Sequence, residues 1–129
     1  MITLNNKKYK DYIVEIEWGK FASNISGIKE EGIAPIIRFI INNKMIELEL
    51  VYSIDKFKAL EINKKIDLYK YLVSVNYEDD NGWMPIYDDK LTIYITKINE
   101  EYFNIDFKIN YDDSDELINI KINDDLKLL

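Results

Sequence analysis

The chain has 129 residues and a formal net charge of −7 at pH 7, with 24 acidic against 17 basic residues, and it contains neither histidine nor cysteine. These missing side chains exclude Ser-His-Asp triads, thiol nucleophiles, disulfides and zinc sites built on histidine or cysteine within the chain. The acidic balance and the single arginine, Arg38, argue against nucleic-acid binding, which depends on clustered lysine and arginine.

The composition favours one globular domain over residues 1–129. Hydrophobic residues make up 47% of the chain, and its 4 glycines and 2 prolines argue against flexible linkers. Met1 to Lys10 is polar and lysine-bearing, and no run approaches the ~20 apolar residues of a membrane helix. We therefore expect a cytoplasmic protein without membrane contact. The abundance of lysine, asparagine, isoleucine and aspartate indicates an AT-rich bacterial or phage gene.

The first part of the chain predicts two strands and a loop. Ile2 to Leu4 ends at the turn-forming pair Asn5-Asn6. Between Tyr12 and Trp18 apolar side chains occupy every even position, which is the period of a half-buried strand. Gly19 to Pro35 has no clear period, so we expect a long loop there with at most one short helical or extended turn.

A β-hairpin is predicted from Ile36 to Ile54. Its turn is Asn42-Asn43, because asparagine tolerates the left-handed conformation that two-residue hairpin turns need. This register places Ile37 opposite Leu48. Arg38 belongs to the other face of the hairpin, where we expect its stem to lie on apolar surface and its head to reach water.

The middle of the chain alternates short elements and turns. Asp55 to Asn63 has helical spacing, with its first residue as a possible N-cap. A helical turn at Asp67 to Leu72 and a strand at Val73 to Glu78 follow, because β-branched residues concentrate in the second segment. After a turn at Asp79 to Gly82, the segment Trp83 to Tyr87 is predicted to be an edge strand, since it contains a proline.

Three strands with a strict period of two follow near the carboxyl end, at Leu91 to Thr96, Tyr102 to Tyr111 and Ile118 to Asn123. We expect them to form an antiparallel meander with one dry and one wet face. A slip of one residue in the pairing of two strands would turn all apolar side chains of one strand outward. Only registers that keep the apolar side chains of both strands on the same side of the sheet are therefore possible.

Loop lengths then predict the pairing of these three strands. A three-residue loop after the first strand places Ile95 opposite Ile105. A four-residue loop, Asp112 to Asp115, places Ile109 opposite Ile118. The whole pattern predicts a mostly β protein, an antiparallel β-sandwich or partly closed barrel of about eight strands with one or two short helices. The alternative is an α+β arrangement with a helix against one sheet.

No phosphate-binding motif occurs in the chain. Two oxygen-rich segments, Glu78 to Asn81 and Asp112 to Glu116, are candidates for calcium. Neither fits an EF-hand, because Gly82 would place Tyr77 at the first ligand position. We interpret both segments as solvated turns, and we expect no metal, no cofactor and no catalytic residue.

Acidic turns and aromatic side chains remain as the candidate binding residues, because amphipathic rings bordered by carboxylates can anchor a protein interface. Tyr94 and Tyr102 fall on the face opposite the buried isoleucines, where Trp83 and Tyr87 would join them, unless a second sheet covers this face and makes the rings part of the core. The predicted partner-binding residues are Asp79, Asp80, Trp83, Tyr87, Tyr94, Tyr102, Asp112, Asp113, Asp115 and Glu116.

The function that these residues favour is a non-enzymatic acidic module that binds a basic protein partner, as immunity proteins and inhibitors that imitate nucleic acid do. Binding should weaken steeply with salt, and neutralising Asp112, Asp113, Asp115 and Glu116 together should weaken it most. One alternative is a structural subunit of an assembly such as a phage particle, joined by aromatic and edge-strand contacts. Another is a small-ligand β-barrel with an interior cavity.

Overall fold

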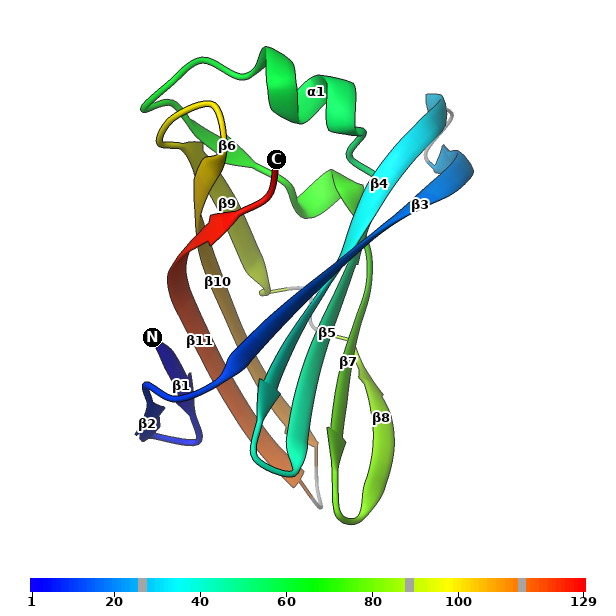
Figure 1. Ribbon diagram of the computed structural model, residues 1–129. Helices are drawn as coiled ribbons and strands as arrows, with labels where there is room; N and C mark the ends of the chain where they lie inside the picture. The colour runs from blue at the N-terminus through cyan, green and yellow to red at the C-terminus, as the bar shows by residue number, and fades with distance from the viewer. Residues whose placement is uncertain (26–27, 88–89, 114–115) are drawn as a thin grey trace.

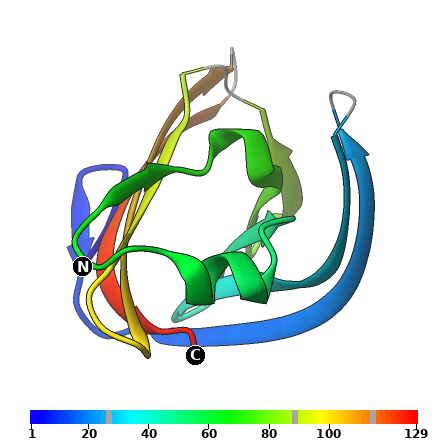
Figure 2. The ribbon, with the colours of Figure 1, turned by 90° about the horizontal axis from the view of Figure 1, so that it is seen from above.

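The computed structural model describes residues 1–25, 28–87, 90–113 and 116–129, which form two antiparallel β-sheets. The six-stranded sheet has the order β2 (Lys7–Tyr9), β1 (Ile2–Leu4), β11 (Glu116–Lys127), β10 (Tyr102–Asp113), β9 (Thr92–Lys97) and β6 (Lys65–Asp67). The five-stranded sheet has the order β3 (Ile13–Ile25), β4 (Ile28–Ile41), β5 (Lys44–Leu50), β7 (Leu72–Asp79) and β8 (Gly82–Ile86). Figure 1 shows the sheets facing each other, with the helix α1 (Ile54–Ala59) across one end. Figure 2 views that end from above, with the 3-10 turn η1 (Tyr69–Tyr71) near the helix.

The core lies between the two sheets. Their inward side chains belong to one hydrophobic cluster, in which Phe39, Phe57, Phe103 and Phe107 are fully buried. Burying one such ring contributes about 2 kcal/mol relative to leaving it exposed. No pairing among the described strands joins an edge of one sheet to the other, so the predicted β-sandwich is confirmed and the barrel is not closed. The α+β alternative is wrong, because the one α-helix among the described residues has only 6 residues.

The carboxyl-terminal meander is confirmed, but one of its two registers is wrong. Ile105 lies opposite Ile95 as predicted, whereas Ile109 lies opposite Ile120 and not opposite Ile118. A shift of two residues keeps every side chain on its predicted face, because side chains alternate between the two faces with a period of two. The error arises from the assumed loop length, since β10 and β11 continue until Asp113 pairs with Glu116.

The hairpin of β4 and β5 is confirmed. Asn42 has a φ of 51°, the left-handed conformation that the turn requires, and Ile37 lies opposite Leu48. The second strand ends at Leu50 and does not reach Ile54, because the chain there turns into α1.

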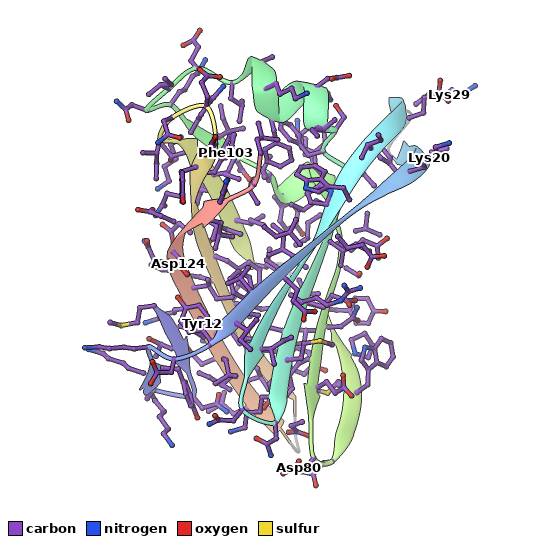
Figure 3. The ribbon with its side chains drawn as sticks, in the orientation of Figure 1. Tyr12, Lys20, Lys29, Asp80, Phe103 and Asp124 are labelled. Carbon is purple, nitrogen blue, oxygen red and sulfur yellow. The ribbon has the colours of Figure 1, made fainter. Side chains whose placement is uncertain are left out.

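The prediction of a loop from Gly19 to Pro35 is wrong. β3 and β4 pair along their whole length, from Ile13 opposite Ile40 to Ile25 opposite Ile28. β4 pairs with β5 only from Ile36 onward, so among the described strands its first part pairs with β3 alone and forms a two-stranded ribbon with it. Figure 1 shows this ribbon extending past the rest of its sheet, and Figure 3 places Lys20 and Lys29 near its tip. A ribbon without a third strand does not bury one complete face, which explains why its sequence lacks a period of two.

The short helix α1 is confirmed, with a different cap from the one predicted. Ser53 is the N-cap, and its hydroxyl oxygen accepts a hydrogen bond from the Lys56 backbone N–H at 3.3 Å. Asp55 instead lies in the first turn, where a negative charge is favourable. At the other end of the helix, Lys97 Nζ donates to the Lys58 carbonyl oxygen at 2.9 Å. No helix of the described residues has the length and apolar character to cross a membrane.

The remaining predicted elements near β7 are also found. The helical turn corresponds to η1, the strand after it to β7, and the segment with the proline to β8 at the edge of the five-stranded sheet. The strand β6 has no counterpart in the sequence analysis, because three residues are too few to display a period. The pair Asp88-Asp89, which precedes the meander, lies outside the described residues.

Tyr12, just before β3, connects the two sheets. Its hydroxyl donates to Asp124 Oδ2 on β11 at 2.6 Å, and its ring packs against Phe39 (Figure 3). Burial raises the pKa of the Tyr12 phenol, and the hydrogen bond to the negatively charged Asp124 raises it further. The neutral phenol is therefore the form that the folded protein retains.

We expect Tyr12→Phe to lower the free energy of unfolding by about 1–2 kcal/mol near neutral pH, because a hydrogen bond to a carboxylate is lost while the ring remains. The tyrosine pKa is higher in the folded than in the unfolded state. Tyr12 therefore contributes stability that is present below pH ~10 and is lost as the pH rises above that value. Urea unfolding at pH ~7 and ~11 should show that the wild type loses more stability than the variant on going to high pH. An equal loss in both proteins would contradict this role of the hydroxyl.

Candidate protein-binding face

Among the side chains that the structure describes, five glutamates and one arginine stand on the outward side of the five-stranded sheet. These positions alternate along each strand with buried residues such as Ile37, Leu48 and Val75, so their side chains point away from the core. We call this surface the acidic face; its charged residues are Glu15 and Glu17 on β3, Arg38 on β4, Glu47 and Glu49 on β5, and Glu78 on β7.

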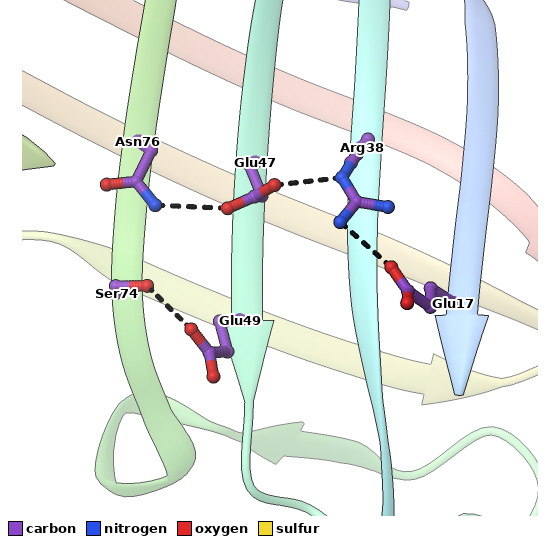
Figure 4. Close-up of polar contacts among 6 residues, drawn as sticks. All are labelled: Glu17, Arg38, Glu47, Glu49, Ser74 and Asn76. Carbon is purple, nitrogen blue, oxygen red and sulfur yellow. Dashed lines mark hydrogen bonds and ion pairs between the residues drawn. The ribbon is translucent and has the colours of Figure 1, made fainter. Parts of the chain in front are cut away.

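Arg38 joins two of these glutamates. Its Nε donates to Glu47 Oε2 at 2.8 Å, and its Nη2 lies 2.9 Å from Glu17 Oε2 (Figure 4). The side chains of Arg38 and Glu47 are only 24% and 20% exposed, so this ion pair is partly shielded from water. The hydrogen bonds to Glu47 and then to Glu17 raise the pKa of Arg38, which stays protonated. The head of Arg38, which the sequence predicts to reach water, bridges two carboxylates in the structure.

Neighbouring polar side chains hold further carboxylate oxygens of the acidic face. Asn76 Nδ2 donates to Glu47 Oε1 at 3.1 Å, and Ser74 Oγ donates to Glu49 Oε2 at 3.2 Å (Figure 4). Glu17, Arg38, Glu47 and Asn76 thus form a continuous chain of polar contacts across four adjacent strands. Carboxylates that are already held in place lose less side-chain entropy when a partner binds.

An apolar row lies beside these charges. Ile13, Ile40 and Met45 stand next to one another on β3, β4 and β5, and Trp83 on β8 ends the row beyond Glu78. The two ends of the row are open to solvent, with Ile13 63% and Trp83 60% exposed. Exposed apolar groups surrounded by charges are typical of the centre of a protein interface.

No protein-family model, curated protein or solved structure matches this chain. The chemistry of the acidic face itself is therefore the basis for assigning a function. In the part of the chain that the structure describes, no three acidic side chains come together as a group that could hold a metal ion. What the face offers is fixed carboxylates next to exposed apolar groups, which can attract and hold cationic side chains.

Four of the predicted binding residues lie on or beside the β7–β8 hairpin. Trp83 belongs to the acidic face, and Tyr87 follows β8 and is 79% exposed. Asp79 Oδ1 accepts a hydrogen bond from the Asn81 backbone N–H at 2.8 Å. Asp80 accepts one from the side-chain amide of Asn43 in the β4–β5 turn. The two aspartates thus stabilise turns, whereas the two aromatic rings are free to contact a partner.

Tyr94 and Tyr102 lie on the outward side of the other sheet. The ring of Tyr94 is half-buried, with Lys65 Nζ 4.3 Å from its centroid, and Tyr102 is 41% exposed at the start of β10. The outward faces of a sandwich point in opposite directions, so Trp83 and Tyr87 do not join these tyrosines. The five-stranded sheet covers the face of the six-stranded sheet that carries the isoleucines and leaves the face with the two tyrosines uncovered. These two rings are therefore not part of the core.

The remaining predicted acids belong to the far end of the meander. Asp112 and Asp113 end β10 and Glu116 begins β11, while their side chains and the whole of Asp115 lie outside the described residues. In Figure 1 this end of β10 lies at the same end of the molecule as the β4–β5 and β7–β8 turns. Along β10 it is about 35 Å from Tyr102. The structure therefore does not bring Tyr102 and these acids together.

The glutamates of β3 and β5 are absent from the predicted binding residues, although a signal for them exists in the sequence. The confirmed hairpin register already places Arg38 opposite Glu47. Glu15 also lies opposite Arg38, through the pairing of β3 with β4. The sequence does not reveal that pairing, because the ribbon that β3 and β4 form has no apolar period and its residues predict a loop.

Proposed function

We propose that the protein is a non-enzymatic binding module whose acidic face docks on a basic surface of a protein partner. The observation that carries this proposal is the placement of five glutamates and only one arginine around an exposed apolar row. In this proposal the protein acts in the cytoplasm, in the manner of an immunity protein or an inhibitor.

Charge and apolar contact have separate roles in this proposal. The net charge of −7 attracts a basic partner over a distance and increases the rate of encounter. Burial of the apolar row then holds the complex together, and Trp83 is the side chain with the largest expected contribution. Burying one exposed apolar side chain of this kind contributes about 1.5–3 kcal/mol.

The proposal is tested with a short synthetic peptide of lysine and leucine as the probe. Trp83 is exposed and Trp18, the only other tryptophan, packs against the core, so tryptophan fluorescence reports binding to the acidic face. We expect the affinity of the wild type to fall about tenfold between ~50 and ~300 mM salt. Replacing Glu15, Glu49 and Glu78 by glutamine should weaken binding by at least about tenfold at low salt.

Two controls decide whether the acidic face is responsible. A peptide with glutamate in place of lysine should not bind. Neutralising Asp112, Asp113, Asp115 and Glu116 removes more charge than the triple glutamine variant, yet it should weaken binding only about twofold, because β10 and β11 belong to the other sheet and not to the acidic face. Salt-insensitive binding would contradict the proposal, and a larger loss in this loop variant would assign binding to the loops that the sequence predicts.

A further inference from the structure

The outward side of the six-stranded sheet carries a row of lysines. Lys8 on β2, Lys121 on β11 and Lys108 on β10 stand in one row across the strands, with Thr3 of β1 between the first two. All three lysines are exposed, and no ion pair joins them to a carboxylate of the described residues. We call them the lysine row.

The lysine row costs the isolated protein stability. Lys108 and Lys121 are directly opposite on neighbouring strands, and like charges in this position destabilise a sheet by about 0.2–1 kcal/mol. On the same side, Asp106 stands two residues before Lys108 on β10 and diagonal to Lys121, so a single carboxylate of the described residues flanks these two lysines. A surface on which two opposed lysines share one flanking carboxylate is expected to serve a contact with an anionic group.

The acidic face provides anionic groups with a matching spacing. Lys8 and Lys121 lie on strands two apart, and so do Glu15 and Glu47. Strands in a sheet are about 4.8 Å apart, so both pairs are separated by about 10 Å. Stacking the two faces with Lys8 opposite Glu15 would bring Lys121 opposite Glu47, and Arg38 between the two glutamates would face Thr3.

We propose that a second copy of this chain is a partner of the acidic face, and that it docks through its lysine row. The inference rests on the proposed function, because it uses the same face. The two surfaces lie on opposite sides of the sandwich, so each contact leaves one acidic face and one lysine row free. Such a head-to-tail contact is not closed, and further copies add to form short chains.

The contact is expected to be weak. The acidic face is five strands wide, about 19 Å from β3 to β8, which is small for a stable interface. The net charge of −7 also repels two copies at long range, but near physiological salt this repulsion is screened beyond ~8 Å while close ion pairs persist. Association should therefore appear at high protein concentration in physiological salt.

Sedimentation equilibrium over a wide range of protein concentration tests the proposal. We expect the average mass of the wild type to rise steadily with concentration and not to stop at the dimer. Reversing the lysine row with Lys108→Glu and Lys121→Glu should weaken association at least about tenfold. The control variant, Lys20→Glu with Lys29→Glu, changes the net charge equally at the tip of the ribbon and should stay within about twofold of the wild type (Figure 3).

A mixing experiment then identifies the two surfaces. Glu15→Lys with Glu78→Lys reverses two exposed positions of the acidic face and should also prevent self-association. An equimolar mixture of this variant with the lysine-row variant should associate again, because one protein retains the lysine row and the other retains the acidic face. Circular dichroism of each variant establishes that it is folded.

Three results would overturn the inference: a wild type that stays monomeric at every concentration, a ribbon control as impaired as the lysine-row variant, or a mixture that does not associate. The lysine–leucine peptide separates this failure from failure of the proposed function. The lysine-row variant should bind that peptide with unchanged affinity, since its acidic face is intact. A lysine-row variant that no longer self-associates but still binds the peptide supports both proposals. Unchanged peptide binding in the Glu15→Lys, Glu78→Lys variant contradicts the proposed function.

Discussion

Replacing Phe57 by alanine is expected to lower the free energy of unfolding by about 3–5 kcal/mol. Phe57 is fully buried, and its ring makes edge-to-face contacts with Trp18, Tyr52 and Phe103 at centroid distances of 5.8, 4.8 and 5.6 Å. Trp18 and Phe103 belong to different sheets, so the ring joins both sheets to α1. The cavity left by alanine cannot close without moving both sheets, which places the cost in the upper part of the range for core substitutions.

Urea unfolding measures this loss, and Lys58→Ala is the matched control. Lys58 lies in the same short helix and its side chain is exposed, so its replacement should change stability by no more than about 0.5 kcal/mol. A loss below about 1 kcal/mol for Phe57→Ala would mean that α1 does not anchor this end of the sandwich.

The second large effect is expected for Arg38→Met, at about 2–4 kcal/mol. Methionine keeps much of the apolar stem of Arg38 but leaves Glu47, which is only 20% exposed, without its cation. Removing one member of a shielded ion pair costs more than the pair itself contributes, because the remaining charge stays desolvated. Urea unfolding near neutral pH measures the loss.

A double-mutant cycle with Glu47→Met tests this explanation. Replacing both Arg38 and Glu47 by methionine should recover at least about half of the loss, since apolar replacement of a whole buried pair is often nearly neutral. Lys20→Met, an exposed cation on the ribbon, serves as the control and should have little effect. Strictly additive losses would show that the two side chains are not coupled.

The same substitution should affect binding in the opposite direction. Arg38→Met removes the only cation of the acidic face, so the lysine–leucine peptide should bind about two- to threefold more tightly although the protein is less stable. Weaker binding would indicate that the main effect of Arg38 is to hold Glu17 and Glu47 in position.

The candidate site could be predicted from the sequence only in part. Trp83 and Tyr87 are exposed, as contact with a partner requires, and the strand that carries Trp83 lies at the edge that its proline predicts. Their grouping with Tyr94 and Tyr102 was wrong, since the sequence does not say that the four rings belong to two different sheets. The sequence does not reveal the acidic face, because the face needs four strands side by side and the pairing of β3 with β4 runs into the ribbon that has no apolar period.

The sequence by itself determined the orientation of side chains in β4, β5, β9, β10 and β11. Alternation is a local property of a strand, and one buried face sets it without reference to distant segments. It also determined the hairpin turn at Asn42, because the left-handed conformation is a property of one residue. Only the tertiary structure decided that β3 continues to Ile25 beside β4, and that β10 and β11 extend to the pair Asp113 and Glu116. Those extensions are stabilised by hydrogen bonds between backbones, and because such pairing does not depend on which side chains the strands carry, it leaves no periodic trace in the amino-acid sequence.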